Sequence, residues 1–181
     1  MTALLSTYTC VVASINRLQG AWLLPTLARF SFIAVLFFYF WNSARTKLGD
    51  GIFGILHPSD NAYIAIFPKA FEAAGYDSSS LSSFHWAVAV AGTVGEFILP
   101  ILLLLGLFTR LAALGMVCFI FIQSYVDVTG HGKTGQDLGA WFDGASGSLI
   151  MDQRLLWVVL LTVMMAKGAG PISLDKLMKI P

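Results

Sequence analysis

Residues 85–110 read HWAVAVAGTVGEFILPILLLLGLFTR, and about twenty consecutive residues of this stretch are apolar. A helix of that length, at roughly 1.5 Å of rise per residue, crosses a hydrocarbon core about 30 Å thick. Glu96 lies near the middle of the stretch. An acidic side chain at that depth costs about 2.5–3.5 kcal/mol on insertion-derived scales. The stretch therefore predicts a transmembrane helix whose one carboxylate faces protein or trapped water rather than lipid.

Pro100 follows Glu96 by one helical turn. Because proline has no N–H group, the carbonyl of Glu96 loses its usual helical hydrogen bond. A carboxylate and an unpaired backbone acceptor then lie at the same depth of the bilayer. Two interpretations follow: a structural kink around a paired or protonated glutamate, and a site for proton, ligand or redox chemistry. We favour the second, because intramembrane carboxylates are rare and costly.

Composition places the whole chain in the membrane class. Hydrophobic residues make up 57% and charged residues 12%, whereas an ordinary soluble domain is roughly 25% charged. The net charge of +1 gives no sign of a nucleic acid partner. Cys10 and Cys118 match neither a CxxC pair nor zinc-ligand spacing. The expected fold is an all-α integral membrane bundle in contact with the lipid bilayer.

Four transmembrane helices are expected in this bundle. Besides the central stretch, the apolar runs predict crossings over Leu23–Trp41, Leu111–Val126 and Leu155–Ala166. The last run is the shortest, so Arg154 and Lys167 at its ends would have to extend toward the two membrane surfaces. The bundle then covers residues 23–167, between an N-terminal interfacial arm at 1–22, with a cleaved signal as the alternative, and a tail at 168–181.

A short surface helix is expected in the first long loop, over Pro68–Gly75. Proline is favoured at the first helical position and glycine just after the last. Phe67 and Phe71 are four residues apart and share one helical face. That face could enter the membrane interface.

The distribution of basic residues predicts the orientation. The N-terminal arm, the turn at Arg110 and the tail together carry five bases and one acid, whereas the two long loops carry five bases and eight acids. Both termini are therefore expected in the cytoplasm. In a bacterium this describes a multi-pass protein of the inner membrane, with its acidic loops in the periplasm.

Several polar residues are candidates for the site around Glu96. Glu96 itself is the expected proton acceptor or ligand contact. Arg29, inside the first crossing, either pairs with Glu96 or extends back to the nearer surface. The candidates for binding a cofactor lie toward the outer side and are Asn42, Lys47, Gln123 and Asp127. His85 and His131 are weak metal candidates, because no two histidines have the i, i+4 spacing of a strong site.

The motif GEFILPILLLLGLFTRLAAL at 95–114, the closing GAGPISLD at 168–175, and Arg29, Asn42 and Lys47 resemble the DoxX family of small bacterial membrane proteins. The resemblance covers about residues 24–176. It implies about four transmembrane helices with both termini cytoplasmic. It also matches Glu96 and Arg29 to the family's second-helix glutamate and first-helix arginine. Some relatives are subunits of a thiosulfate:quinone oxidoreductase or of assemblies that handle thiol and oxidative stress; others resemble accessory proteins of metal-handling peptide systems.

Three hypotheses for function remain open at this point. In the first, the chain is a partner-dependent membrane subunit of a redox system, and the bundle binds quinone or a small sulfur or thiol substrate. In the second, it is a cofactor-free accessory or scaffold subunit of a larger membrane complex. In the third, it transports a small solute, a metal or protons through the Glu96 region, although it lacks the inverted repeat common in transporters. The first two imply a protein partner in the membrane or periplasm.

Overall fold

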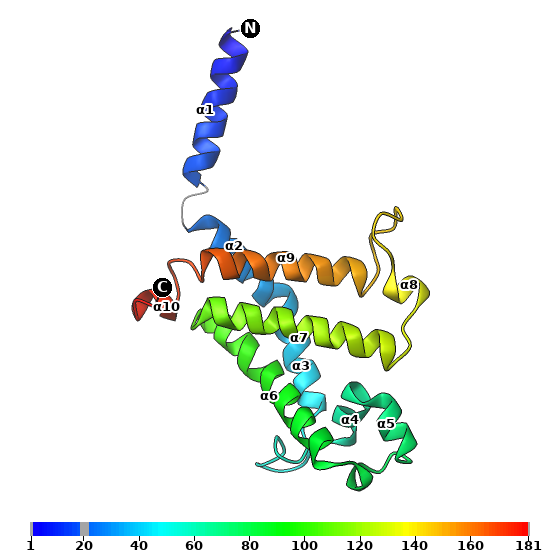
Figure 1. Ribbon diagram of the computed structural model, residues 1–181. Helices are drawn as coiled ribbons and strands as arrows, with labels where there is room; N and C mark the ends of the chain where they lie inside the picture. Colours follow the sequence, from blue (N-terminus) through cyan, green and yellow to red (C-terminus); the bar gives the residue numbers. More distant parts are fainter. Residues whose placement is uncertain (1, 19–21, 181) are drawn as a thin grey trace.

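The structure, a computed structural model, describes residues 2–18 and 22–180, and the regular elements among these residues are all helices, with no strand. Helix α1 (Thr2–Leu18) projects from the rest of the molecule in Figure 1. Its side chains from Leu4 to Val11 are exposed. Helix α1 lies within the expected N-terminal arm at 1–22; the arm's boundary and its contact with the membrane interface stay predictions.

Three helices are long and apolar enough to cross a membrane. The first combines α2 (Leu23–Phe32), a π-helical turn η1 (Ile33–Phe37) and α3 (Phe38–Thr46) into one span of 24 residues. The others are α6 (Ser83–Leu105), which continues through Pro100, and α7 (Thr109–Thr129). These spans occur where the sequence predicted the first three crossings. The first continues five residues beyond the predicted end at Trp41, because α3 follows the π-helical turn without a break.

Helix α9 (Met151–Lys167) forms the fourth part of the bundle and packs against α2 and α7. The shared core contains completely buried large side chains from all four helical segments, among them Phe32, Leu103, Met116 and Leu161. Lipid tails are as apolar as these side chains, so close packing rather than the hydrophobic effect must hold such helices together. Gly115 shows how close the packing is: a Cβ atom there would lie 2.9 Å from Leu99 Cδ2.

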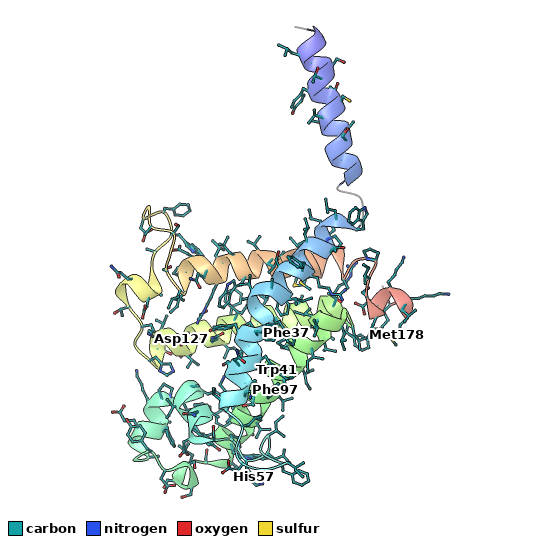
Figure 2. The ribbon with its side chains drawn as sticks, turned by 180° about the vertical axis from the view of Figure 1, so that it is seen from behind. Phe37, Trp41, His57, Phe97, Asp127 and Met178 are labelled. Atoms are coloured by element: carbon teal, nitrogen blue, oxygen red, sulfur yellow. The ribbon has the colours of Figure 1, made fainter. Side chains whose placement is uncertain are left out.

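Aromatic rings join α3 to α6 next to Glu96. Trp41 stacks on Phe37 with ring centroids 5.7 Å apart, and it meets the edge of Phe97 at 4.9 Å (Figure 2). Offset and edge-to-face pairs of this kind add about 0.5–1.5 kcal/mol each beyond the buried area. The Trp41–Phe97 pair fixes α3 against the part of α6 that carries the carboxylate, and Phe37 supports the Trp41 ring from within the first span.

The long loop between the first span and α6 contains two short helices, α4 (Asp60–Ile66) and α5 (Pro68–Ala73). Helix α5 begins at Pro68, as the sequence predicts. Phe71, however, is 1% exposed and packs on Tyr63 with centroids 5.9 Å apart. The expectation that Phe71 faces the membrane interface is therefore wrong: its ring joins α5 to α4 in a second small core.

The bundle has two ends, which we call the tail end, where residues 168–180 lie, and the loop end, where residues 47–82 and 130–150 lie. At the tail end the carboxylate of Asp175 accepts hydrogen bonds from the backbone N–H groups of Phe108 (2.7 Å) and Thr109 (2.9 Å). At the loop end Arg154, near the start of α9, pairs with Asp127, near the end of α7. Helices α7 and α9 are therefore antiparallel, joined directly at the loop end and through the tail at the tail end.

Three smaller elements complete the described chain. They are the 3-10 turn η2 (Ser78–Ser80), α8 (Gly135–Leu138) and α10 (Leu174–Leu177). Helix α10 belongs to the tail and α8 to the second long loop (Figure 1).

Candidate functional site

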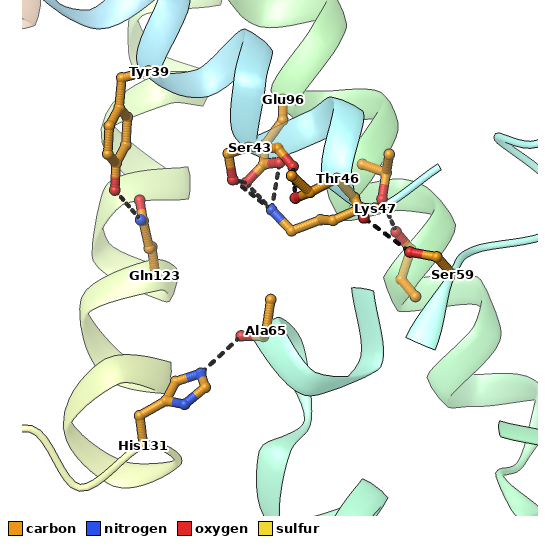
Figure 3. Close-up of polar contacts among 11 residues, drawn as sticks. Tyr39, Ser43, Thr46, Lys47, Ser59, Ala65, Glu96, Gln123 and His131 are labelled. Carbon is orange, nitrogen blue, oxygen red and sulfur yellow. Dashed lines mark hydrogen bonds and ion pairs between the residues drawn. The ribbon is translucent and has the colours of Figure 1, made fainter. Parts of the chain in front are cut away.

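Glu96 is buried in the middle of α6, with 4% of its surface exposed. The ammonium group of Lys47 donates to both carboxylate oxygens, at 2.6 Å to Oε1 and 2.5 Å to Oε2 (Figure 3). Ser43 lies one helical turn before Lys47, donates to Glu96 Oε1 at 3.3 Å and accepts from Lys47 at 2.8 Å. The three side chains form one compact hydrogen-bonded group.

The pair explains how a carboxylate is tolerated at this depth. A single buried charge costs several kcal/mol, and a partner with good hydrogen-bond geometry offsets much of that cost. Lys47 is 5% exposed, so both charges are withdrawn from solvent. Because Lys47 follows the last residue of α3, its flexible stem can extend from the helix end toward the bundle interior.

Arg29 is not the partner of Glu96. Its guanidinium donates to the backbone carbonyls of Leu104 (2.9 Å), Ala169 (3.4 Å) and Ile172 at the tail end. Leu104 lies about 12 Å along α6 from Glu96, at a rise of roughly 1.5 Å per residue. Arg29 and Lys47 lie toward opposite ends of the same span. Because α3, at the Lys47 end, packs on α6, Lys47 rather than Arg29 reaches the carboxylate. Arg29 instead joins the first span, α6 and the tail.

A cavity of about 590 Å³ opens beside the Lys47–Glu96 pair and is bordered by α3, α4, α6 and α7. Its walls are mainly apolar, with Ile64, Val88 and Phe119 among the lining residues. The polar lining includes five of the residues singled out from the sequence: Lys47, Glu96, Gln123, Asp127 and His131. An apolar cavity of this size with a few convergent polar groups is typical of a small-molecule site.

The remaining candidates lie elsewhere. Asn42 is exposed on α3 and does not line the cavity. His85 accepts or donates a hydrogen bond with the Ser82 hydroxyl at 2.8 Å and packs against Phe67. His131 bonds the carbonyl of Ala65 through Nε2 at 3.2 Å, so it joins the end of α7 to α4 (Figure 3). Among the described residues no three metal-ligating side chains gather into a cluster, and the two histidines are not brought together.

Asp127 also belongs to a second polar group. The guanidinium of Arg154 donates to Asp127 and, at 2.8 Å, to the Ser124 hydroxyl. Arg154 is 7% exposed. Arg154 therefore does not extend into solvent, because the half-buried carboxylate of Asp127 is available one helix away. Figure 2 places Asp127 near the loop end of the bundle.

A second cavity of about 780 Å³ lies on the other side of this group, between the first span and α9. Gln123 and Asp127 line both cavities. Gln123 donates to the Tyr39 hydroxyl at 2.9 Å, and its buried Oε1 has no hydrogen-bond partner among the residues the structure describes. Where this second cavity reaches the exposed loop, Asp137 raises the pKa of Lys133 through a 2.7 Å hydrogen bond and its charge.

Sequence reasoning missed Ser43, Tyr39 and Arg154 as members of these polar groups. For Ser43 there was a usable pattern, because it lies four residues before Lys47 and thus on the same helical face. For Tyr39 and Arg154 the sequence held no such pattern, because their partners lie on a different helix, α7.

The family model of DoxX matches residues 24–126, which is more than half of the chain. The chain belongs to the DoxX family. No curated protein and no solved structure matches it. The match to the DoxX model includes Arg29, Lys47, Glu96 and Gln123 and ends one residue before Asp127. The DoxX region thus contains the buried ion pair and most of its cavity, whereas His131, Arg154 and α9 lie beyond the match.

Proposed function

We propose that this DoxX-family protein is a membrane subunit of a redox-linked system and that its cavity of about 590 Å³ binds a quinone. The observation that supports this most is the buried Lys47–Glu96 pair in the wall of an otherwise apolar cavity. A quinone ring is flat and mostly apolar, and its two carbonyl oxygens accept hydrogen bonds. Gln123 has a second amide N–H that could donate to such an oxygen, because only one is used on the Tyr39 hydroxyl. Lys47 and His131 also line the cavity, where they donate within the protein to Glu96, Ser43 and the Ala65 carbonyl.

The position of the cavity favours a lipid-soluble ligand over a water-soluble thiol. Ala91 on α6 and Ile122 on α7 both line the cavity, and both are exposed on the outer surface of candidate spans. The cavity therefore reaches the face of the protein that the acyl chains would cover. A small sulfur or thiol substrate would instead have to arrive from the loop end.

In the proposed reaction a partner protein supplies the electrons, and this chain handles the protons. Reduction of a quinone to a quinol takes up two electrons and two protons. The electrons would come from a partner oxidoreductase. Both protons would come from solvent at the loop end, and Glu96 would take up one at a time and pass it to a ligand oxygen while Lys47 holds the side chain in place. This assigns Glu96 as the ligand contact and makes the chain a partner-dependent subunit. Arg29 acts at the tail end and has no part in this step.

Titration of the purified protein with ubiquinone-1, followed by quenching of tryptophan fluorescence, tests the quinone site. Glu96→Gln should weaken binding at least tenfold, which corresponds to about 1.4 kcal/mol. Gln123→Leu should weaken it as well, and it leaves the ion pair intact. The matched control is Glu72→Gln, since Glu72 is exposed on α5. Equal affinity of all four proteins, each with unchanged helical content, would contradict the quinone site.

A second candidate function is a scaffold subunit without a cofactor. It is favoured by large apolar side chains that are exposed at the loop end, outside the candidate spans. Ile52 is 97% exposed, Phe53 is 69% exposed, and the side chain of Phe142 is fully exposed. Two separate loops thus present apolar side chains to a periplasmic or membrane partner. Loss of partner binding on changing these residues, together with no quinone binding by the wild type, would favour this second function.

We further propose that α9 crosses the membrane, so that the bundle has four crossings. Its start is paired with the end of α7 through Arg154 and Asp127, and the tail that follows it accepts hydrogen bonds at the start of α7 through Asp175. Its 17 residues extend about 25 Å at roughly 1.5 Å per residue. If α7 crosses, α9 must traverse nearly the same depth. Together with the basic tail end, this supports both termini in the cytoplasm of a bacterial inner-membrane protein.

Cysteine labelling in whole cells tests this topology. In a background with Cys10→Ser and Cys118→Ser, the variant Ala145→Cys should react with a membrane-impermeant maleimide, because the α8–α9 loop would face the periplasm. Lys179→Cys in the tail should react only after the cells are lysed. Labelling of both positions in intact cells would show that α9 does not cross, and labelling of the tail alone would show the reverse orientation.

A further inference from the structure

A third cavity, of about 300 Å³, lies at the tail end of the bundle, far from the Lys47–Glu96 pair. It is formed where α7 begins, α9 ends and the tail folds back over both. Three basic residues from three different segments line it: Arg110 on α7, Lys167 on α9 and Lys176 on α10. Their side chains are exposed, and none of them forms an ion pair with a residue that the structure describes.

The one acid in this cavity does not neutralise the three bases. Asp175 is 8% exposed, and its two oxygens are taken up by the backbone N–H groups of Phe108 and Thr109. It thus caps the start of α7, where the helix dipole also favours a negative charge. The cavity keeps an excess of positive charge and suits an anion that several cations can contact.

The depth of the cavity indicates where such an anion comes from. The cavity lies where two candidate spans meet, just after the end of α6 at Leu105 and at the start of α7 at Thr109. Trp22, which precedes the first span and is 50% exposed, also lines it. Tryptophan is enriched at the level of lipid headgroups, and basic cavities between transmembrane helices bind anionic headgroups.

We infer that this tail-end cavity binds the phosphate group of an anionic phospholipid. Arg110, Lys167 and Lys176 contact the phosphate oxygens, and the acyl chains of the lipid lie along the exposed apolar surfaces of α7 and α9. A bound lipid of this kind would join α7, α9 and the tail. The inference does not depend on the quinone site.

Native mass spectrometry of the protein in detergent, with added dioleoyl phosphatidylglycerol or dioleoyl phosphatidylcholine, tests the inference. The wild type should bind the anionic lipid at least tenfold more tightly than the zwitterionic one. The triple variant Arg110→Gln, Lys167→Gln, Lys176→Gln should lose this preference. The matched control, Arg45→Gln, Lys69→Gln, Lys179→Gln, removes the same charge from exposed positions outside the cavity and should keep it.

One further outcome distinguishes a lipid from free phosphate as the ligand, and another tests the site itself. Inorganic phosphate at millimolar concentration should displace little of the bound phosphatidylglycerol, because it lacks the acyl chains. Complete displacement would identify a site for free phosphate and overturn the lipid assignment. An equal loss of preference in both triple variants, with thermal unfolding unchanged, would show a general effect of net charge and overturn the site itself.

Discussion

Replacing Lys47 by methionine should lower the free energy of unfolding in detergent by about 3–5 kcal/mol. Methionine is similar in length to lysine, so the loss of packing is small. The dominant effect is that the Glu96 carboxylate, 4% exposed, loses the ammonium group that donates to both of its oxygens. Unfolding with increasing mole fraction of SDS, followed by circular dichroism, measures the change.

A second substitution separates the ion pair from packing. The double variant Lys47→Met, Glu96→Gln removes both charges and should recover most of the lost stability, because replacing a whole buried pair is often nearly neutral. Lys69→Met changes an exposed lysine on α5 and should stay within about 0.5 kcal/mol of the wild type. If the loss of stability in the double variant equalled the sum of the losses in Lys47→Met and Glu96→Gln, the two side chains would not interact, contrary to the structure.

Gly106→Ala should also destabilise the protein strongly, by about 2–4 kcal/mol. Gly106 ends α6 with a φ of +65°, a left-handed conformation that costs a residue with a Cβ atom about 1–2 kcal/mol. Its Cβ would also lie 2.6 Å from Ser173 Cβ and 2.9 Å from the guanidinium of Arg29. The tail would have to move away from α6, which would break the hydrogen bond from Asp175 N to the Gly106 carbonyl.

Gly75→Ala is the matched control for this substitution. Gly75 also follows a helix, with a φ of +66°, but nothing lies within 4 Å of its added Cβ. The difference between the two alanine variants in SDS unfolding therefore measures the close approach of the tail and of Arg29 to Gly106. Equal destabilisation by both would mean that the tail does not pack against the end of α6.

The sequence was sufficient to predict the helical membrane class and the place of three spans, because long apolar runs have few other structural outcomes. It did not reveal the π-helical turn at Ile33–Phe37 or helix α4. The π-helical turn occurs within a uniformly apolar run, where no residue marks a change in hydrogen bonding. Helix α4 is short and depends on Ala62 and Tyr63 packing against Phe71 and Ala89.

The candidate site was predicted in part, and the reason lies in helix geometry. Glu96 was found from its cost in the membrane, and Gln123, Asp127 and His131 from their position at the outer end of one helix. Arg29 was the partner considered for Glu96, and Lys47 was assigned to cofactor binding, because depth along a helix can be read from sequence but the direction in which a side chain faces cannot. The crossing of α3 over α6 makes Lys47 the partner.

Photolabelling with an azidoquinone tests the central claim most directly, since it identifies where a quinone binds rather than whether it binds. The account predicts label on peptides covering α4 and residues 119–131, which line the cavity beside Glu96, and much less label on these peptides in Glu96→Gln. Two results would contradict it. One is label confined to residues 154–160 of α9, a segment that lines only the cavity of about 780 Å³. The other is label that Glu96→Gln does not reduce.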